Sequence, residues 1–184
     1  MKPISLFVLG VMVASTNALA QAPADAIEKA LLAAPENVRD TATVIRWKPD
    51  HTYDTLKKGT NRLVCYDRSG FPLERPFSVE CTSIANLERV AQNLKLEAAG
   101  AGDEKKTQAL LDAAEKDGTR VKPEYGSIFY NFRGPDRERA TRHTTVAVPG
   151  ATARSTGLPD TRDEGGAWVM FAGTSSAHIM LPGR

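Results

Sequence analysis

The chain has 184 residues, of which 41% are hydrophobic and 25% charged, and its formal net charge is +2. These fractions are ordinary for a globular protein, and so small a charge gives no general attraction to nucleic acid or to an anionic membrane. The composition therefore indicates a folded domain of common size and gives no reason to expect nucleic-acid partners.

The first 20 residues have the pattern of a cleavable signal peptide. Lys2 precedes a short apolar core over residues 4–14, and Ala18-Leu19-Ala20 has the small-x-small form of a signal-peptidase site. An N-terminal core helix is the alternative, but core helices alternate polar and apolar faces. No apolar stretch approaches the ~20 residues of a membrane span. We therefore expect a periplasmic or secreted chain over residues 21–184, forming one monomeric domain without a membrane span.

A helix and three closely spaced strands are predicted to open the mature chain. Residues 23–34 begin with a proline, carry their acidic residues early and use strong helix formers before Pro35. Turn residues then separate three runs rich in β-branched and aromatic residues, at 41–47, 52–56 and 62–66. We expect these strands to form an antiparallel meander.

The two cysteines, Cys65 and Cys81, predict one disulfide. An even pair in an exported chain is typical of a cross-link, and a loop of about 15 residues would contribute roughly 3 kcal/mol. The bond would tie the intervening Gly- and Pro-containing loop, 67–77, to the end of the meander. A metal site and a catalytic thiol are the alternatives.

Two helices are predicted in the middle of the chain. Residues 83–94 place apolar side chains three or four positions apart, with Thr82 or Ser83 as the N-cap. Asp103 is expected to cap a second helix over 104–116. The residues expected to face inward are Ile84, Leu87, Val90, Ala91 and Leu94 in the first helix and Ala109, Leu110, Ala113 and Ala114 in the second.

The last third of the sequence again favours strands. They are predicted at 125–132 and 144–148 and in a hairpin of 167–171 with 177–181. Between them lie two long polar loops, and such loops are either functional or mobile. The predicted fold is α+β: an antiparallel sheet, made of the meander and the C-terminal hairpin, with two to three helices on one side.

Several short motifs resemble a group of uncharacterised secreted bacterial proteins. They are the Gly59-Thr60-Asn61 segment leading to Cys65, the C-terminal Gly173-Thr174 segment with Ala177-His178-Ile179-Met180-Leu181-Pro182, and two shorter pieces, 42–47 and 157–160. The resemblance implies that the mature chain is a single exported unit. It brings no assigned activity.

The histidines are the first candidates for chemistry. His51 follows Pro49-Asp50 and is expected to be an exposed turn residue. His143 and His178 each begin an apolar strand that ends in Pro-Gly, so the two imidazoles would lie close together if these strands are neighbours. We therefore predict a ligand site where the two long loops meet these strands, with His143, His178, Arg142 and Trp168 as its residues.

Two alternatives give these residues different chemistry. A histidine-dependent hydrolase would use His143 or His178 as a base, with Ser175 or Ser176 nearby and the acidic residues Asp160, Asp163 and Glu164 in the preceding loop. No Gly-x-Ser-x-Gly elbow is present, however. A copper site would use His178 and Met180, with His143 and Met170 possible across the sheet, because copper favours soft N/S ligands. Methionine at strand spacing is more often core filling.

The arginines of residues 133–142 offer a third kind of site. They could hold an anion, but Asp136 and Glu138 lie among them and favour a solvated loop that pairs with itself. No cofactor motif is present. The leading interpretation is therefore a small exported binding or accessory protein without established catalysis, with no cofactor and an unknown ligand or protein partner.

Overall fold

The structure, a computed structural model, describes residues 18–162 and 165–182. The predicted signal peptide thus lies almost wholly outside the described residues, although its expected cut after Ala20 falls within the first helix. Helices, with one short 3₁₀ turn η1, and strands appear in the following order: α1 Ala18–Leu31, α2 Glu36–Arg39, β1 Thr43–Trp47, β2 Tyr53–Lys57, β3 Leu63–Asp67, β4 Phe77–Ser83, η1 Ile84–Asn86, α3 Leu87–Gly100, α4 Glu104–Lys116, β5 Ile128–Gly134, β6 Thr141–Ala147, α5 Ala153–Thr156, β7 Trp168–Met170 and β8 His178–Pro182.

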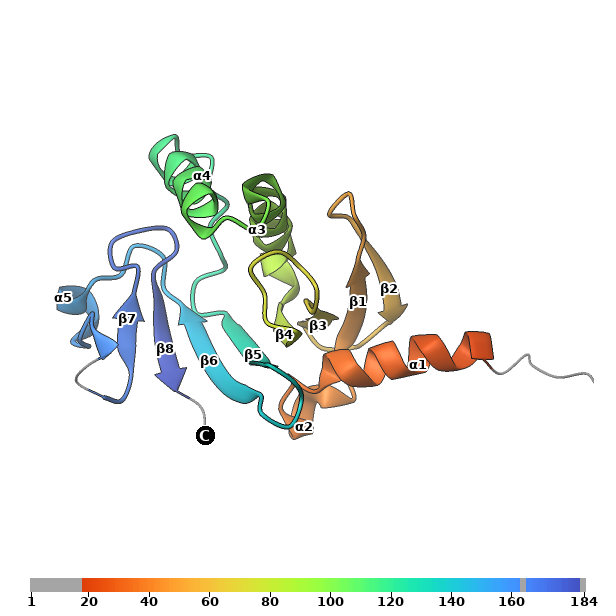
Figure 1. Ribbon diagram of the computed structural model, residues 1–184. Coiled ribbons are helices and arrows are strands. Elements are labelled where there is room, and N and C mark those ends of the chain that lie inside the picture. The colour runs from red at the N-terminus through yellow and green to blue at the C-terminus, as the bar shows by residue number, and fades with distance from the viewer. Residues whose placement is uncertain (1–17, 163–164, 183–184) are drawn as a thin grey trace, which may run out of the picture.

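The strands form one eight-stranded sheet in the order β2-β1-β3-β4-β5-β6-β8-β7 (Figure 1). All neighbouring pairs are antiparallel except β1 and β3, which are parallel. The α+β class is confirmed. The all-antiparallel sheet and the meander are wrong, because β1 lies between β2 and β3.

Gly59 lies where the link from β2 to β3 comes very close to the chain that enters β1. The link from β2 to β3 passes against the start of β1, where the amides of Thr60 and Asn61 both donate to the carbonyl of Thr41, at 2.8 and 3.1 Å. A Cβ on Gly59 would collide with the backbone of Thr41 and Ala42. Only glycine permits so close an approach of two backbones.

Strand β4 is central to the sheet, yet the sequence analysis predicted no strand between the loop of residues 67–77 and the helix expected from residue 83. It pairs with β3 on one side and β5 on the other. Its residues alternate, with Phe77, Val79 and Cys81 on one face, so the strand signal was present. The Cys65–Cys81 disulfide is confirmed: the two cysteines are directly opposite in the β3–β4 register, with their Cα atoms 4.0 Å apart.

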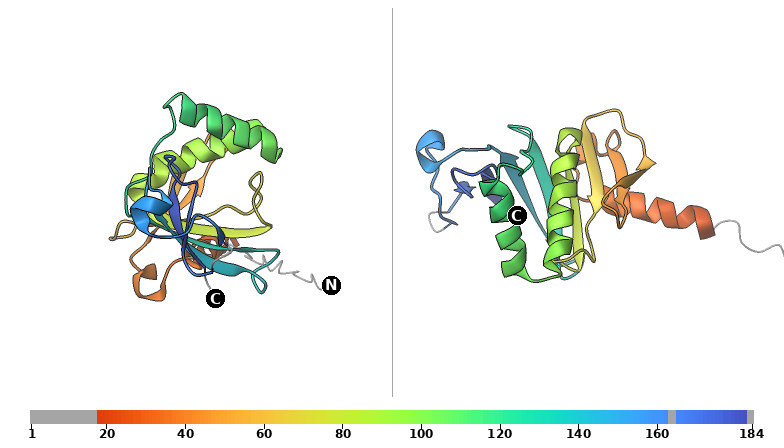
Figure 2. Two further views of the ribbon diagram at one scale, coloured as in Figure 1. Left: turned by 90° about the vertical axis from the view of Figure 1, so that its left-hand side faces the viewer. Right: turned by 90° about the horizontal axis from the view of Figure 1, so that it is seen from above.

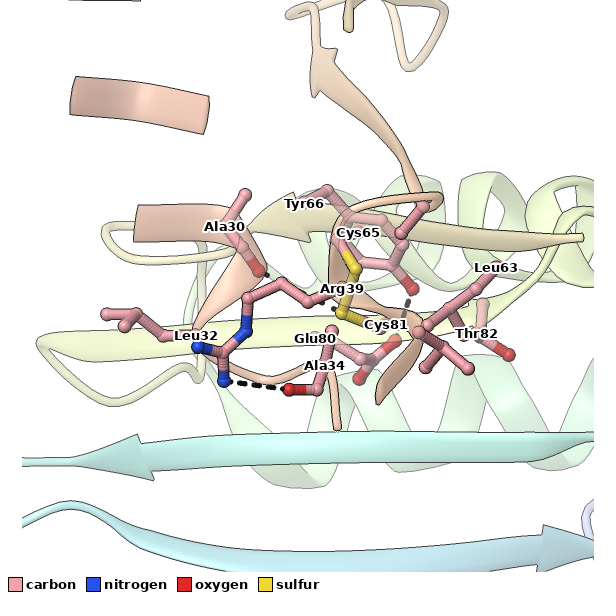
Figure 3. Close-up of a disulfide and its surroundings, with 12 residues drawn as sticks. Ala30, Leu32, Ala34, Arg39, Leu63, Cys65, Tyr66, Glu80, Cys81 and Thr82 are labelled. Atoms are coloured by element: carbon pink, nitrogen blue, oxygen red, sulfur yellow. Dashed lines mark hydrogen bonds between the residues drawn. A yellow bond between two sulfur atoms is a disulfide. The ribbon is translucent and has the colours of Figure 1, made fainter. Parts of the chain in front are cut away.

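Each face of the sheet carries its own core, which corrects the expectation that the helices pack on one side. Alternate residues of β3 make the division clear. Cys65 belongs to the core beneath α1, which includes Ala30, whereas Tyr66 packs with Leu87 and Val90 of α3. Figure 3 shows the disulfide beside Ala30, and Figure 1 shows α1 on the side of the sheet opposite to α3 and α4.

Helix α3 follows the prediction only in part. Leu87, Val90 and Leu94 are buried as expected, but Ile84 lies before α3 and is 52% exposed. Ser83 caps η1, since its hydroxyl accepts a hydrogen bond from the amide of Ala85.

Helix α4 has the predicted bounds and the predicted cap, because Asp103 accepts a hydrogen bond from the amide of Lys106 at 3.0 Å. Its packing differs from the prediction: Ala109 and Ala113 are exposed, and Thr107 is its one buried residue. Figure 2 shows α4 beside α3. Helix α4 is therefore a largely exposed, polar helix that contributes little to the hydrophobic core.

The C-terminal hairpin is confirmed, with β7 and β8 antiparallel and β8 inserted between β7 and β6. Val169 and Ala177 are fully buried, whereas Leu181 is 39% exposed. The short helix α5, not predicted, occupies part of the long loop before β7, and its N-cap is Thr152. None of the helices in the described ranges is long and apolar enough to cross a membrane.

Candidate functional site

A cleft of about 470 Å³ lies between the sheet and the α3–α4 hairpin. Its floor comes from β5, β6, β7 and β8, and its walls come from α3, α4 and the segments after them. Charged, aromatic and thioether side chains share this space. A cleft of this size falls within the range typical of small-molecule sites.

The sheet register determines which strand residues face the cleft. Residues directly opposite one another share a face. One row across the sheet joins Glu80, Asn131 and His143, and another joins Ala147, His178 and Met170. The two histidines therefore lie on the same face, and both line the cleft.

The two imidazoles do not lie side by side, however. Strands β6 and β8 are antiparallel, so His143 is opposite Pro182, whereas His178 is opposite Ala147. This offset of four residues corresponds to roughly 13 Å along the strands. The backbone positions of the two histidines are therefore offset along the floor, although the charge of His178 still lowers the pKa of His143.

Two buried arginines form a basic wall. Arg89 of α3 is 7% exposed and Arg120, after α4, is 8% exposed. Arg89 donates to the carbonyl of Val121 and, at 2.7 Å, to the hydroxyl of Ser176. Arg120 donates to the amide oxygens of Gln92 and Asn93. These partners are neutral oxygens, so they position the guanidiniums without cancelling their charge.

The electrostatics of Arg89 reflect this arrangement. Burial, together with the charge of Arg120, lowers its pKa from 12.5 to about 10, and Glu115 offsets part of the shift. Burial also lowers the pKa of Arg120. Glu115 itself accepts hydrogen bonds from the amide and the hydroxyl of Ser175, the former at 2.6 Å. One carboxylate therefore lies near two buried guanidiniums.

The other end of the cleft is acidic. Arg68, 6% exposed, pairs with Glu97 of α3 and, at 3.5 Å, with Glu74. Glu80 on β4 accepts a hydrogen bond from the hydroxyl of Tyr66 (Figure 3). Burial raises the pKa values of Glu80 and Glu97, although Arg68 opposes the shift at both. Arg68 thus interacts with three carboxylates at this end, and Arg133 also acts on Glu80.

Both histidines are held in the neutral form. Burial, reinforced by the charges of Arg133 and His178, lowers the pKa of His143 to about 4. Burial also lowers the pKa of His178. The Nδ1 atom of His178 lies 2.9 Å from the carbonyl oxygen of Ser176. That contact requires a proton on Nδ1 and leaves the lone pair on Nε2.

Thioethers surround His178. Met170 is its direct partner on β7, and Met180 follows two residues later on the same face of β8. The ring of Phe171 lies 5.7 Å from the imidazole. Among the residues that the structure describes, no group of three or more His, Cys, Asp or Glu side chains could hold a metal ion. Any metal here would therefore depend on the methionine sulfurs.

The other two residues predicted for the ligand site do not line the cleft. Arg142 is on the opposite face, where its guanidinium lies 4.0 Å from the ring centroid of Phe132 and donates to the carbonyl of Leu32. Trp168, the partner of Met180 in the β7–β8 register, has Arg162 over its ring. Arg139 pairs with Asp136, as expected for a loop that pairs with itself.

The residues expected for a hydrolase have other partners. The hydroxyl of Ser175 donates to Glu115, and that of Ser176 accepts from Arg89. The contact of His178 is with the backbone of Ser176. Asp160 lies before β7, and Asp163 and Glu164 fall outside the described residues.

Sequence reasoning missed the basic wall because it used only the apolar stripe of α3. A polar stripe runs beside it, with Asn86, Arg89 and Asn93 spaced by three and four residues. Asn86 is fully buried and its amide donates to Thr82 and Ser127. Polar residues adjoining an apolar stripe were the available signal for a buried polar surface.

Comparisons of the chain with protein families, with curated proteins and with solved structures found no match. The candidate site therefore depends on its geometry alone.

Proposed function

We propose that the protein is an exported binding protein that holds a small ligand in the cleft between the sheet and the α3–α4 hairpin, without catalysis. The observation that carries this proposal is the cleft itself, about 470 Å³ in volume and lined by polar and apolar side chains together. Ligand sites combine an apolar lining with a few convergent polar groups in the same way.

Export is part of the proposal. The N-terminal pattern of a signal peptide and the internal disulfide both support it. Expression of the full chain in a bacterium, followed by intact-mass analysis of the periplasmic and medium fractions, tests it. We expect a product that begins at Gln21 with its disulfide formed. An uncleaved product retained in the cytoplasm would contradict export.

Binding in the cleft can be tested with a ligand screen and two tryptophan variants. Thermal-shift measurements against a library of small metabolites should identify compounds that stabilise the mature protein. His143→Trp places a large ring on the cleft floor and should abolish these shifts, whereas Arg46→Trp, on an exposed position of β1, should retain them. Equal shifts in all three proteins, or no shift from any compound, would contradict binding in the cleft.

Binding of Cu(I) is a second candidate, favoured by one observation. The register aligns Met170 with His178, and the contact of Nδ1 with Ser176 leaves Nε2 free as a ligand. Competition with a chromophoric Cu(I) chelator tests it: the wild type should compete, His178→Gln and Met180→Leu should not, and His51→Gln should behave as the wild type. Failure of the wild type to compete would remove this candidate.

A further inference from the structure

Arg89 and Arg120 are more than nine-tenths buried, and both face the cleft. In the part of the chain that the structure describes, neither forms an ion pair within 4 Å, unlike Arg68 at the other end. A buried cation costs free energy unless a charged partner compensates it. The charges of these two buried guanidiniums are therefore not fully compensated by the protein, and an anionic ligand bound between them would compensate them.

We infer that the cleft selects a carboxylic acid with an apolar body, bound as a monoanion with its carboxylate at Arg89 and Arg120. This inference rests on the proposed function, because it names the class of ligand for the same cleft. Each guanidinium has five N–H groups, more than the acceptors that Val121, Ser176 and the two amide side chains provide, so donors remain for a ligand. A planar carboxylate matches the guanidinium fork.

The charge of the wall favours a single negative charge on the ligand. Arg89 and Arg120 contribute two positive charges and Glu115 one negative charge, while burial keeps His178 neutral. Glu97 also acts on Arg120, but its carboxylate is paired with the guanidinium of Arg68, so these two charges offset each other. The remainder is one positive charge. A monocarboxylate neutralises it, whereas a phosphate dianion would leave an excess negative charge beside two guanidiniums that are themselves buried.

Apolar side chains next to the basic wall favour an apolar body. Phe129, Met170 and Met180 line the cleft from the sheet, Phe171 lines it from the connection after β7, and Leu111 lines it from α4. Thioethers and phenyl rings both make favourable contacts with an aromatic ring. The proposed ligand therefore places an aromatic or aliphatic body over β7 and β8, with its carboxylate toward α3.

Isothermal titration with two isosteric probes tests this class. The first, 3-phenylpropionate, carries the carboxylate, and the second, 3-phenylpropanamide, replaces it with a neutral amide of the same shape. We expect the mature protein to bind the acid at least tenfold more tightly than the amide. Acetate, which lacks the body, and inorganic phosphate, which carries more charge, should each bind more weakly than the acid.

Variants connect the selectivity to the named residues. Arg120→Gln and Arg89→Gln should each reduce the preference for the acid to less than threefold, and Leu111→Ala should weaken binding of both phenyl probes. Arg46→Gln, an exposed arginine on β1, should change neither. Circular dichroism is the control that each variant is folded. Because Leu111 is on the partly exposed helix α4, its variant should fold and still test the contact with the phenyl ring if an arginine variant fails to fold.

The outcomes separate this inference from the proposed function. Equal affinity for acid and amide would overturn the inference while leaving a ligand-binding cleft. Selectivity that survives in both arginine variants would overturn the assignment of the carboxylate to this wall. If neither the acid nor the amide binds, the inference is overturned as well. The metabolite screen with His143→Trp would then decide the proposed function independently.

Discussion

Gly100, the last residue of α3, packs directly against Thr107 of α4, so that a Cβ at Gly100 would collide with the Thr107 hydroxyl. Thr107 is 3% exposed, and its hydroxyl has no hydrogen-bond partner in the described part of the chain. Since Thr107 is the buried residue of α4, this contact fixes how the helix lies over the cleft.

Gly100→Ala should therefore destabilise the protein by about 1–3 kcal/mol, the usual cost of overpacking. Thr107→Ala alone should cost no more than about 1 kcal/mol, because it removes one buried methyl group together with a hydroxyl that has no partner. The double variant should recover about 1 kcal/mol relative to the sum of the single changes, since the two side chains compete for the same space. Urea denaturation of the four proteins measures this coupling. Strict additivity would show that the helices can separate without cost.

Glu115 attaches the other end of α4 to the β7–β8 connection through its two hydrogen bonds from Ser175. Burial raises the pKa of this carboxyl, but these hydrogen bonds outweigh it, and the net pKa lies below its usual value. Stability from Glu115 is therefore present above the unfolded pKa and lost as pH falls through the folded pKa.

Glu115→Gln should loosen α4 without unfolding the sheet. We expect faster amide hydrogen exchange in the second half of α4 and at Ser175, while exchange in β4 and β5 stays unchanged. Asp112→Asn, one turn earlier, is the matched control, because Asp112 is exposed and accepts a hydrogen bond only from Gln108 of its own helix. Similar exchange in the two variants would show that Ser175 does not hold α4.

The sequence correctly predicted those structural features that depend on residues close together in the chain. Asp103 predicted the start of α4 because an N-cap needs only its own side chain and the next turn. The Cys65–Cys81 pair and the β7–β8 hairpin were likewise predictable. The position of β1 between β2 and β3 was not, because it depends on a backbone crossing at Gly59 that no period or propensity encodes.

In the candidate site, too, some features could be predicted from neighbouring residues and others depend on the tertiary fold. The sequence placed His143 and His178 at the starts of two apolar strands, but the pairing of these strands and the offset of the two histidines follow from the antiparallel register of β6 and β8. Arg142 was expected beside His143, yet adjacent residues of a strand point to opposite faces. Arg89 and Arg120 come from a helix and a loop 31 residues apart, and only the tertiary fold brings them to one wall.

The disulfide lies on the face of the sheet opposite to the cleft, so its removal should affect stability more than binding. We expect Cys65→Ala combined with Cys81→Ala to lower the free energy of unfolding by about 3 kcal/mol, as estimated for a loop of this length. Urea denaturation measures the loss, and reducing agent should lower the stability of the wild type but not of the variant. A ligand found in the screen should keep its affinity within about threefold. Much weaker binding would mean that the cross-link shapes the cleft floor.

His143 should make the protein less stable at mildly acidic pH. Its pKa in the folded protein is about 4, lower than the ordinary value of 6.5, because of burial and the nearby charges of Arg133 and His178. Between these two values the unfolded chain takes up the proton and the folded protein does not, so stability falls as pH decreases from about 6.5 to about 4. After screening, the loss should be on the order of 1 to 3 kcal/mol.

His143→Asn removes the titrating group and should flatten the stability curve in this interval. Urea denaturation at several pH values between 4 and 7.5 gives the comparison, and the variant's difference from the wild type should shrink or reverse at the acidic end. Other groups, including Glu80 and Glu97 with their raised pKa values, contribute equally to both proteins and cancel. Thr144→Asn, the next residue on the opposite face, should shift stability by the same amount at every pH. A constant difference for His143→Asn as well would show that the imidazole titrates freely and that the cleft does not exclude water from it.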